Sequence, residues 1–463
     1  MPERAIADTY DASISSSRLI YDTPDAASSS SRLVLDGSAC TAASSSTRLV
    51  LGGSNEEWQR IPPLGHTPET MLAYVIRRDR EGDLRRAFQV ERVATPKPGP
   101  GEVVVLVMAA GINYNGIWAA LGRPRSVFDS HKHPFHIAGS DASGVVWQIG
   151  PGVKRWKVGD EVVIHGNMTC GECEACNGYD PMGCENHRVC GYETPYGSFA
   201  QLMVVQGQQL LRKPPQLTWE EAASYGVGCF TAYRMLDRAD LGTNETVLIW
   251  GAAGGLGCFA IQLARLQGAI PIAVVSNDEK AQVARLLGAE AVIDRTEFPD
   301  LAYNPGETPE RMRRRLAATR AFGRAVQAAL GERGVRADGV DVVFEHTGRE
   351  TFPASVFLTR RMGRIVICGA TSGYELTFDV RHLWMRQKSI IGCHGSNAQD
   401  SQRANELVCQ SKVKPVLSKA YTVDECVLAH EEMRQNLKIG TTACLMCAPR
   451  LGLRNFAEAR AAV

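Results

Sequence analysis

The sequence lacks any apolar run close to the ~20 residues that a membrane-spanning helix needs. Its first residues also lack the apolar centre of a secretory signal peptide. Neither sign of charge is in excess, because 51 Lys and Arg stand against 50 Asp and Glu and leave a formal net charge of +1. A chain so balanced has no electrostatic preference for nucleic acid or a membrane surface. We therefore expect a cytoplasmic protein with neither as a partner.

Residues 1–54 lack any helix or strand pattern long enough to bury a core. The related segments SSSRLIYD, SSSRLVLD and SSSTRLVL recur there among Ala, Asp and Thr. This composition predicts a disordered Ser-rich leader, with a repeat-based binding role as the alternative. The remaining residues of the 463-residue chain suffice for two ordinary domains.

A glycine-rich turn in VLIWGAAGGLG is the most informative motif. The apolar run 247–250 meets four glycines and then a stretch of helical period; the glycines are Gly251, Gly254, Gly255 and Gly257. A strand turning sharply into a helix needs glycine's freedom at positive φ, and a diphosphate must approach the backbone N–H groups at the helix N-terminus. The context predicts a Rossmann-type dinucleotide site rather than an ordinary Gly-containing turn.

The next apolar run, 270–275, predicts a second strand, followed by a helix that ends at Gly288. An NAD site would place an acid at the end of this strand, where it binds the ribose 2′-hydroxyl. Ser276 stands there instead, with Lys280 four residues on, and both suit an added phosphate. NADP(H) is favoured, although the nearby Asp278 and Glu279 leave NAD(H) open.

The order of patterns indicates an α/β protein in which one domain is inserted into another. Strand pairs with Gly and Asp turns predict a barrel-like β-rich catalytic domain at 55–216, and the parallel αβ pattern occupies 217–392. Residues 393–463 then return to the catalytic domain. A segment at 298–334 with the basic run 311–315 reads as an insertion, either a solvated helix, a subunit contact or a coenzyme A phosphate site.

Four cysteines in the first part have the spacing of a metal site: Cys170, Cys173, Cys176 and Cys184. Two-residue gaps let successive thiolates turn onto one ion, and four sulfurs close a tetrahedral zinc shell with no open position. We expect a structural zinc rather than a catalytic one.

This cysteine lobe followed by the nucleotide domain resembles the medium-chain dehydrogenase/reductase superfamily over about residues 70–450. The resemblance implies a GroES-like catalytic domain. Zinc alcohol dehydrogenases in this superfamily carry catalytic ligands where this chain has Asn113, Ser140 and Asp141. Without that Lewis acid, hydride addition to an activated C=C becomes a better proposal than C–O redox chemistry.

Further blocks are spread over most of the chain: GINYNGIW, GSDASGVVW, GYETPYGSFAQ, LTWEEAASYG, VFEHTGRETF and LWMRQKSIIGCHGSN. They resemble the crotonyl-CoA carboxylase/reductases, which reduce a 2-enoyl-CoA with NADPH and attach carbon dioxide to give an alkylmalonyl-CoA, an extender unit for polyketide assembly. The resemblance implies a carbon dioxide pocket made by Asn115, Tyr192, Glu193 and His394, and a homodimer or homotetramer. Taken singly, Asn115 could be a helix cap, Glu193 a surface acid and His394 a strand-end histidine.

Two positions depart from that family. Tyr192 stands where Phe is usual, and Gly395 replaces a bulky aromatic after the histidine. A phenol and space for water both favour protonation of an enolate over its carboxylation. A non-carboxylating enoyl-thioester reductase and a nucleotide-binding protein without turnover therefore stay open as alternatives.

Overall fold

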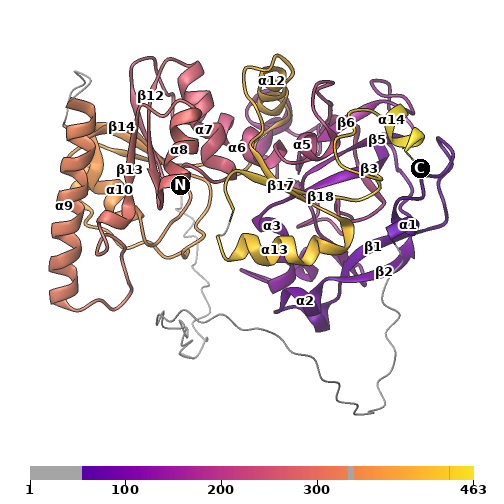
Figure 1. The fold of residues 1–463 in the computed structure, drawn as a ribbon, viewed down its shortest axis with the longest axis horizontal. Coiled ribbons are helices and arrows are strands. Elements are labelled where there is room, and N and C mark those ends of the chain that lie inside the picture. Colours follow the sequence, from indigo (N-terminus) through magenta and orange to yellow (C-terminus); the bar gives the residue numbers. More distant parts are fainter. Residues whose placement is uncertain (1–54, 332–337, 437, 463) are drawn as a thin grey trace, which may run out of the picture. The chain divides into compact units, whose positions relative to one another are not determined.

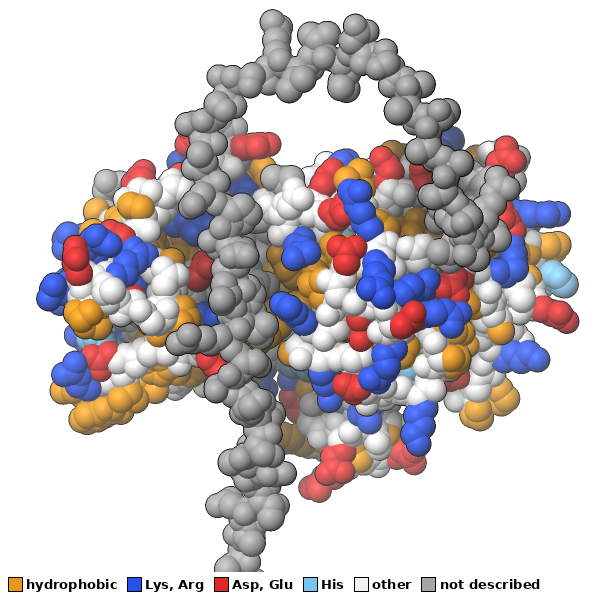
Figure 2. Space-filling model, turned by 90° about the horizontal axis from the view of Figure 1, so that it is seen from below, with side chains coloured by type: hydrophobic (Ala, Val, Ile, Leu, Met, Phe, Trp, Pro, Cys, Tyr) orange, Lys and Arg blue, Asp and Glu red, His pale blue; other side chains and the backbone are white. Residues whose placement is uncertain are grey.

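The computed structural model describes residues 55–331, 338–436 and 438–462. The leader predicted at 1–54 lies outside the described residues. No helix in the described part is long and apolar enough to cross a membrane. On the face shown in Figure 2, basic and acidic side chains are interspersed.

The glycine-rich turn follows one strand of a six-stranded parallel sheet (Figure 1). Its order is β13 (Ala291–Asp294), β12 (Ile270–Val275), β11 (Thr246–Ile249), β14 (Val340–Glu345), β15 (Thr359–Ile367) and β16 (Ser389–Gly392). The chain moves outward from β11 in one direction and then restarts on its other side at β14. Such a switch point is where open α/β sheets bind nucleotides, so the predicted Rossmann-type domain is confirmed.

Helices cover both faces of this sheet, which explains the unbroken apolar run before the turn. Val247 and Ile249 lie in one core with α6 (Gly226–Arg238) and α7 (Gly255–Leu266). Leu248 and Trp250 lie in another, where Trp250 stacks on Phe322 of α9 (Pro309–Gly331) at 5.5 Å. A strand buried on both faces must be apolar at every position rather than at alternate ones.

The remaining helices of this domain are α8 (Asp278–Leu286) and α10 (Phe352–Leu358), with the short α11 (Arg381–Trp384) before β16. Helix α9 is the predicted insertion. Three arginines of its basic run form ion pairs: Arg311 and Arg314 contact Asp300, and Arg315 lies 2.6 Å from Glu307. This pairing favours a structural role over a coenzyme A phosphate site.

A second, mixed sheet is built from segments that precede and follow the parallel sheet in the sequence. Its path is β10 (Leu210–Arg212), β6 (Glu161–Ile164), β5 (Ala142–Ile149), β3 (Glu102–Ile112), β18 (Thr441–Leu445) and β17 (Leu417–Tyr421), with β9 (Leu202–Gln206) also on β3. Strand β18 pairs with β3 antiparallel, so residues beyond 393 complete a sheet begun before residue 217. The insertion of one domain into the other is therefore confirmed.

Smaller elements flank this sheet. They are β1 (Thr70–Ile76), β2 (Gln89–Ala94) and β4 (His136–Ile137) in one sheet, β7 (Asn167–Met168) and β8 (Arg188–Val189) in another, and helices α1 (Asn55–Trp58), α2 (Leu84–Ala87), α3 (Tyr114–Leu121), α4 (Glu174–Gly178), α5 (Trp219–Ala223), α12 (Ala398–Cys409), α13 (Cys426–Arg434) and α14 (Phe456–Ala461). Helix α5 packs on the mixed sheet, whereas α12 packs on α6. Elements near the expected boundaries thus contact both domains.

Arg234 of α6 ties these parts together. Its guanidinium contacts Asp180, in the loop after α4, and lies 2.6 Å from Asp400 of α12. The Arg234 and Asp400 side chains are each only 6% exposed. Removing one partner of a buried pair leaves an uncompensated charge.

We expect R234M to lower the free energy of unfolding by about 3 kcal/mol, because Asp400 stays buried without its cation. Chemical denaturation followed by circular dichroism measures this, with the exposed Arg60 as the control in R60M. An equal loss in the two variants would contradict the assignment.

Candidate active site

The glycine-rich turn has the backbone geometry that the motif predicted. Gly251 has a φ of +53°, and Gly254 is the N-cap of α7. A Cβ on Gly257 would lie 2.5 Å from the Gly251 carbonyl oxygen, so the helix can pack this closely only with glycine. The returning chain meets the turn, since the Gly440 N–H donates to the Ala253 carbonyl at 2.7 Å.

Ser276 follows β12 at the same edge of the sheet. The Lys280 ammonium lies 3.2 Å from its hydroxyl oxygen, so the two predicted side chains are together. Burial, and then the neighbouring Arg295, lower the pKa of Lys280. Arg295 comes directly after β13, and the sequence reasoning missed it. Its position at the carboxyl end of the adjacent parallel strand was the available signal.

The four predicted zinc ligands form a compact cluster. All their sulfur atoms lie within 4.8 Å of one another, and pairs are separated by 3.8 Å (Cys170 to Cys176), 3.5 Å (Cys173 to Cys176) and 3.6 Å (Cys184 to Cys170). A tetrahedral ion with Zn–S bonds of ~2.3 Å sets its sulfurs ~3.8 Å apart. The cluster therefore fits zinc with four protein ligands.

Asn113 and Asp141, which stand where alcohol dehydrogenases carry catalytic zinc ligands, are joined by hydrogen bonds. The Asn113 amide donates to the Asp141 carboxylate at 3.0 Å, and the Val227 N–H donates to the same group at 2.6 Å. Burial raises the pKa of Asp141 to about 7, and burial lowers that of the nearby Lys438 to about 8. The Asp141 carboxylate thus accepts hydrogen bonds from Asn113 and from the backbone of Val227.

Asn115 reaches toward the same place. Its side-chain amide donates to the hydroxyl of the buried Ser140 at 3.1 Å. The cap of α3 is Asn113, whose side chain accepts from the Asn115 N–H at 3.0 Å. The reading of Asn115 as a helix cap is thus wrong, because Asn113 occupies the cap position.

Tyr192 and Glu193 lie in a tight turn after β8. The Glu193 N–H donates to the Val189 carbonyl at 2.8 Å, and its carboxylate accepts from the Val189 N–H at 2.9 Å. Glu193 also lies 3.3 Å from the exposed Arg125. The Tyr192 hydroxyl donates to the Arg123 carbonyl at 3.1 Å, and burial raises its pKa to about 12.

His394 follows β16 and meets the same region through His187. The two imidazole rings contact edge to face with centroids 5.3 Å apart. Burial, and then His394, lower the pKa of His187, whereas Glu193 raises it. His187 therefore contacts one predicted site residue, His394, and interacts electrostatically with another, Glu193; no motif pointed to it.

Gly395, one of the departures from the family, lies against Asn167. A Cβ on Gly395 would be 2.4 Å from the Asn167 side-chain nitrogen, and its φ is +58°. Asn167 in turn contacts His187 at 3.0 Å and donates to the Ser396 carbonyl at 2.9 Å. Local packing and backbone conformation explain glycine here.

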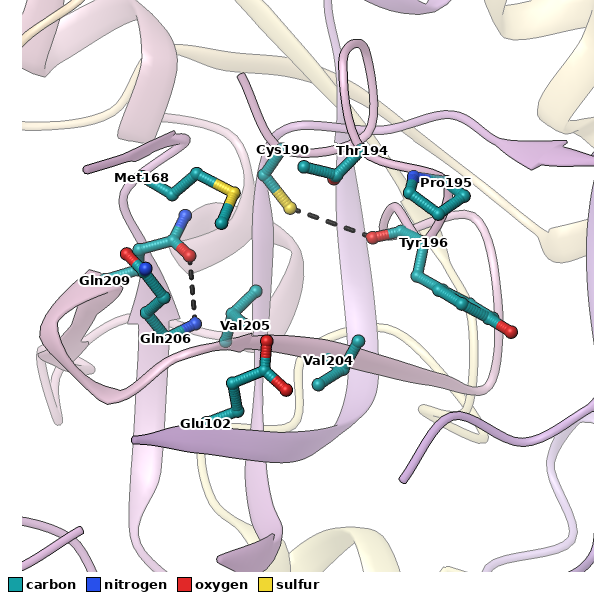
Figure 3. A pocket seen from close by; sticks show the side chains of 10 residues that line it. All are labelled: Glu102, Met168, Cys190, Thr194, Pro195, Tyr196, Val204, Val205, Gln206 and Gln209. Carbon is teal, nitrogen blue, oxygen red and sulfur yellow. Dashed lines mark hydrogen bonds between the residues drawn. The ribbon is translucent and has the colours of Figure 1, made fainter. Parts of the chain in front are cut away.

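A cavity of about 250 Å³ borders the 190–196 loop (Figure 3). Its walls are Glu102, Met168, Cys190, Thr194, Pro195, Tyr196, Val204, Val205, Gln206 and Gln209. None of the four predicted site residues lines it. The cavity therefore lies beside the turn that carries Tyr192 and Glu193.

For the cysteine cluster, we expect roughly one zinc per chain in the purified protein and almost none in C173S. The melting temperature of C173S should fall by about 5 °C or more, because a metal held only by the fold adds to its stability. Elemental analysis and thermal denaturation measure this, with C409S, outside the cluster, as the control. A protein without zinc would refute the site.

Comparisons with known proteins agree with this geometry. Residues 99–215 match the alcohol dehydrogenase GroES-like domain, and residues 255–410 match the zinc-binding dehydrogenase family. A crotonyl-CoA carboxylase/reductase from Cereibacter sphaeroides is 49% identical over 86% of this chain and 93% of its own length.

Two solved structures are also similar. A crotonyl-CoA carboxylase/reductase is 45% identical, with a TM-score of 0.82 over 88% of this chain and 95% of that one. A 2-octenoyl-CoA carboxylase reductase in complex with NADP and 2-octenoyl-CoA is 38% identical, with a TM-score of 0.78 over 86% and 92%. The chain belongs to the crotonyl-CoA carboxylase/reductase family of the zinc-binding dehydrogenases.

Proposed function

We propose that the protein catalyses the NADPH-dependent reductive carboxylation of a 2-enoyl-CoA to an alkylmalonyl-CoA. The observation that carries the proposal is the grouping of Glu193, His187 and His394 beside the nucleotide domain, in a chain 49% identical to a named carboxylase/reductase. Such a product would serve as an extender unit for polyketide assembly.

The preference for NADPH rests on Ser276, Lys280 and Arg295. A hydroxyl and two cations at the ends of neighbouring strands suit a ribose 2′-phosphate. The relative solved with 2-octenoyl-CoA has NADP bound. The two acids that would favour NAD(H), Asp278 and Glu279, are exposed in the first turn of α8. Lys280 instead turns toward Ser276, the residue at the end of the strand.

Bound NADPH would supply a hydride to the β-carbon of the enoyl thioester, which leaves an enolate at the α-carbon. The Asn115 amide and the His394 imidazole can donate hydrogen bonds to carbon dioxide oxygens as negative charge develops. Glu193 can orient the histidine pair or hold an ordered water. The site must also exclude water, because a proton reaching the enolate gives a saturated acyl-CoA.

A non-carboxylating enoyl-thioester reductase is the second candidate. The Tyr192 phenol favours it, since a hydroxyl near the enolate is a possible proton source. In the structure this hydroxyl donates to the Arg123 carbonyl, and its raised pKa makes it a weaker acid than an ordinary phenol. Both features weigh on the side of carboxylation.

We further propose a cytoplasmic homodimer or homotetramer with a structural zinc in each chain. Strand β16 is an edge of the parallel sheet, and Ile390 on it is 40% exposed. Trp384 and Met385 beside it are also exposed, at 63% and 55%. An open strand edge with exposed apolar side chains suits pairing with a second copy.

Crotonyl-CoA and a longer 2-enoyl-CoA, each with NADPH, test the reaction with and without bicarbonate plus carbonic anhydrase. We expect NADPH oxidation and, with bicarbonate, a product that mass spectrometry shows to carry an added carboxyl group. A saturated acyl-CoA under both conditions would favour the non-carboxylating reductase. Absence of oxidation would leave only nucleotide binding.

Replacing Lys280 tests the cofactor assignment. We expect K280A to raise the KM for NADPH about tenfold, because one charge-assisted hydrogen bond to phosphate is lost, and to leave the KM for NADH nearly unchanged. Initial rates with either cofactor give the KM for NADPH and the KM for NADH, and E279Q on the same turn is the control. Equal effects on NADPH and NADH would contradict a 2′-phosphate site.

A further inference from the structure

Two histidines outside the predicted site, His131 and His136, form a hydrogen-bonded chain that ends on the turn. The His133 N–H donates to His131 Nδ1 at 3.2 Å. His131 Nε2 then lies 3.1 Å from His136 Nδ1, and His136 Nε2 lies 3.2 Å from the Gly191 carbonyl oxygen. The chain thus runs from one backbone group, through two imidazole rings, to another.

The backbone groups at the two ends, the His133 N–H and the Gly191 carbonyl, determine which nitrogen of each imidazole carries the proton. A backbone N–H can only donate, so His131 Nδ1 accepts and a neutral His131 carries its proton on Nε2. That proton is donated to His136 Nδ1, so His136 carries its own proton on Nε2. The Gly191 carbonyl can only accept and receives it. One tautomer of each ring satisfies every contact.

Geometry and burial support two neutral rings. Their planes are within 5° of parallel with centroids 5.3 Å apart, so the nitrogens meet edge to edge. His136 is buried, and burial lowers its pKa to about 3. Burial, and then His133, also lower the pKa of His131. A further proton would force two N–H groups against each other.

The Gly191 carbonyl stands directly before Tyr192 and Glu193. On the other side of the peptide, the Gly191 N–H donates to the Thr194 hydroxyl at 3.1 Å. Cys190, Thr194 and Tyr196 of this loop line the cavity of about 250 Å³ (Figure 3). Part of the loop therefore faces a cavity, and its hydrogen bonds position it together with the close packing of Gly191 on Gly139.

We propose that His131 and His136 are positioning residues for carbon dioxide capture, since they hold the Gly191 carbonyl and with it the turn that bears Tyr192 and Glu193. The inference rests on the proposed carboxylation. Neither histidine touches the reacting atoms. With the chain broken, the turn moves, Glu193 loses its place beside His187, and the enolate is protonated more often than it is carboxylated.

Four variants test the chain. Leucine removes each donor in H136L and H131L, whereas glutamine retains a side-chain N–H in H136Q and H131Q. The readout is the fraction of oxidised NADPH recovered as carboxylated product, beside the rate of NADPH oxidation without carbon dioxide. H66L is the control, because the hydrogen bonds of His66 use its backbone, whose N–H donates to the Pro63 carbonyl and whose carbonyl accepts from Trp147.

We expect H136L to lower the carboxylated fraction about fivefold, the effect of one lost hydrogen bond, while NADPH oxidation changes less than about twofold. H136Q should keep most of the fraction. H131L should act in the same direction, because His136 is then free to carry its proton on Nδ1 rather than on Nε2. The His131 ring is half-buried, so H131L is expected to disturb folding less than H136L.

An unchanged product fraction in both leucine variants would overturn the proposal. So would a parallel fall of NADPH oxidation, or a loss in H136Q equal to that in H136L. If the unaltered protein yields only saturated acyl-CoA, the proposed carboxylation fails instead. Hydrogen exchange of the 189–193 amides then tests whether the two histidines hold this turn. Faster exchange in the leucine variants alone supports that role, and unchanged exchange overturns it.

Discussion

The close approach of two glycines, Gly139 and Gly191, is the constraint on which the candidate site depends. A Cβ on Gly191 would lie 2.1 Å from the Gly139 carbonyl oxygen, and one on Gly139 would lie 2.2 Å from the Ser198 hydroxyl oxygen. Only glycines allow this contact, and Gly191 also has a φ of +64°. It brings the turn with Tyr192 and Glu193 against the segment of Ser140, to which Asn115 is hydrogen bonded.

The same scaffold explains how a zinc-dehydrogenase fold can serve C=C chemistry. Where alcohol dehydrogenases bind catalytic zinc, Asn113 and Asp141 bind each other, and the Ser140 hydroxyl accepts from Asn115. In the proposed mechanism, the Asn115 amide and the His394 imidazole donate to the negative charge that develops on carbon dioxide. The four-cysteine cluster is made of other residues, and we propose that a zinc bound there stabilises its own lobe.

Local patterns predicted what local physics determines. The strand 270–275, the helix ending before Gly288 and the four-cysteine cluster follow from periodicity, turn chemistry and spacing, and all agree with the structure. The interactions of His187 with His394, of Arg295 with Lys280 and of His136 with Gly191 were not predicted, because each joins residues distant in sequence. The family resemblance predicted site roles for Asn115 and His394, whereas the fold shows that Asn113 caps α3 and that Gly395 packs on Asn167.

The central claim is that carbon dioxide, rather than a proton, reaches the α-carbon of the enolate. The most direct measurement is a reaction in deuterium oxide with ¹³C-bicarbonate and carbonic anhydrase, with the product examined by nuclear magnetic resonance. A ¹³C carboxyl group bonded to the α-carbon in most of the product is the predicted result. Deuterium at the α-carbon with no ¹³C carboxyl group would contradict the account.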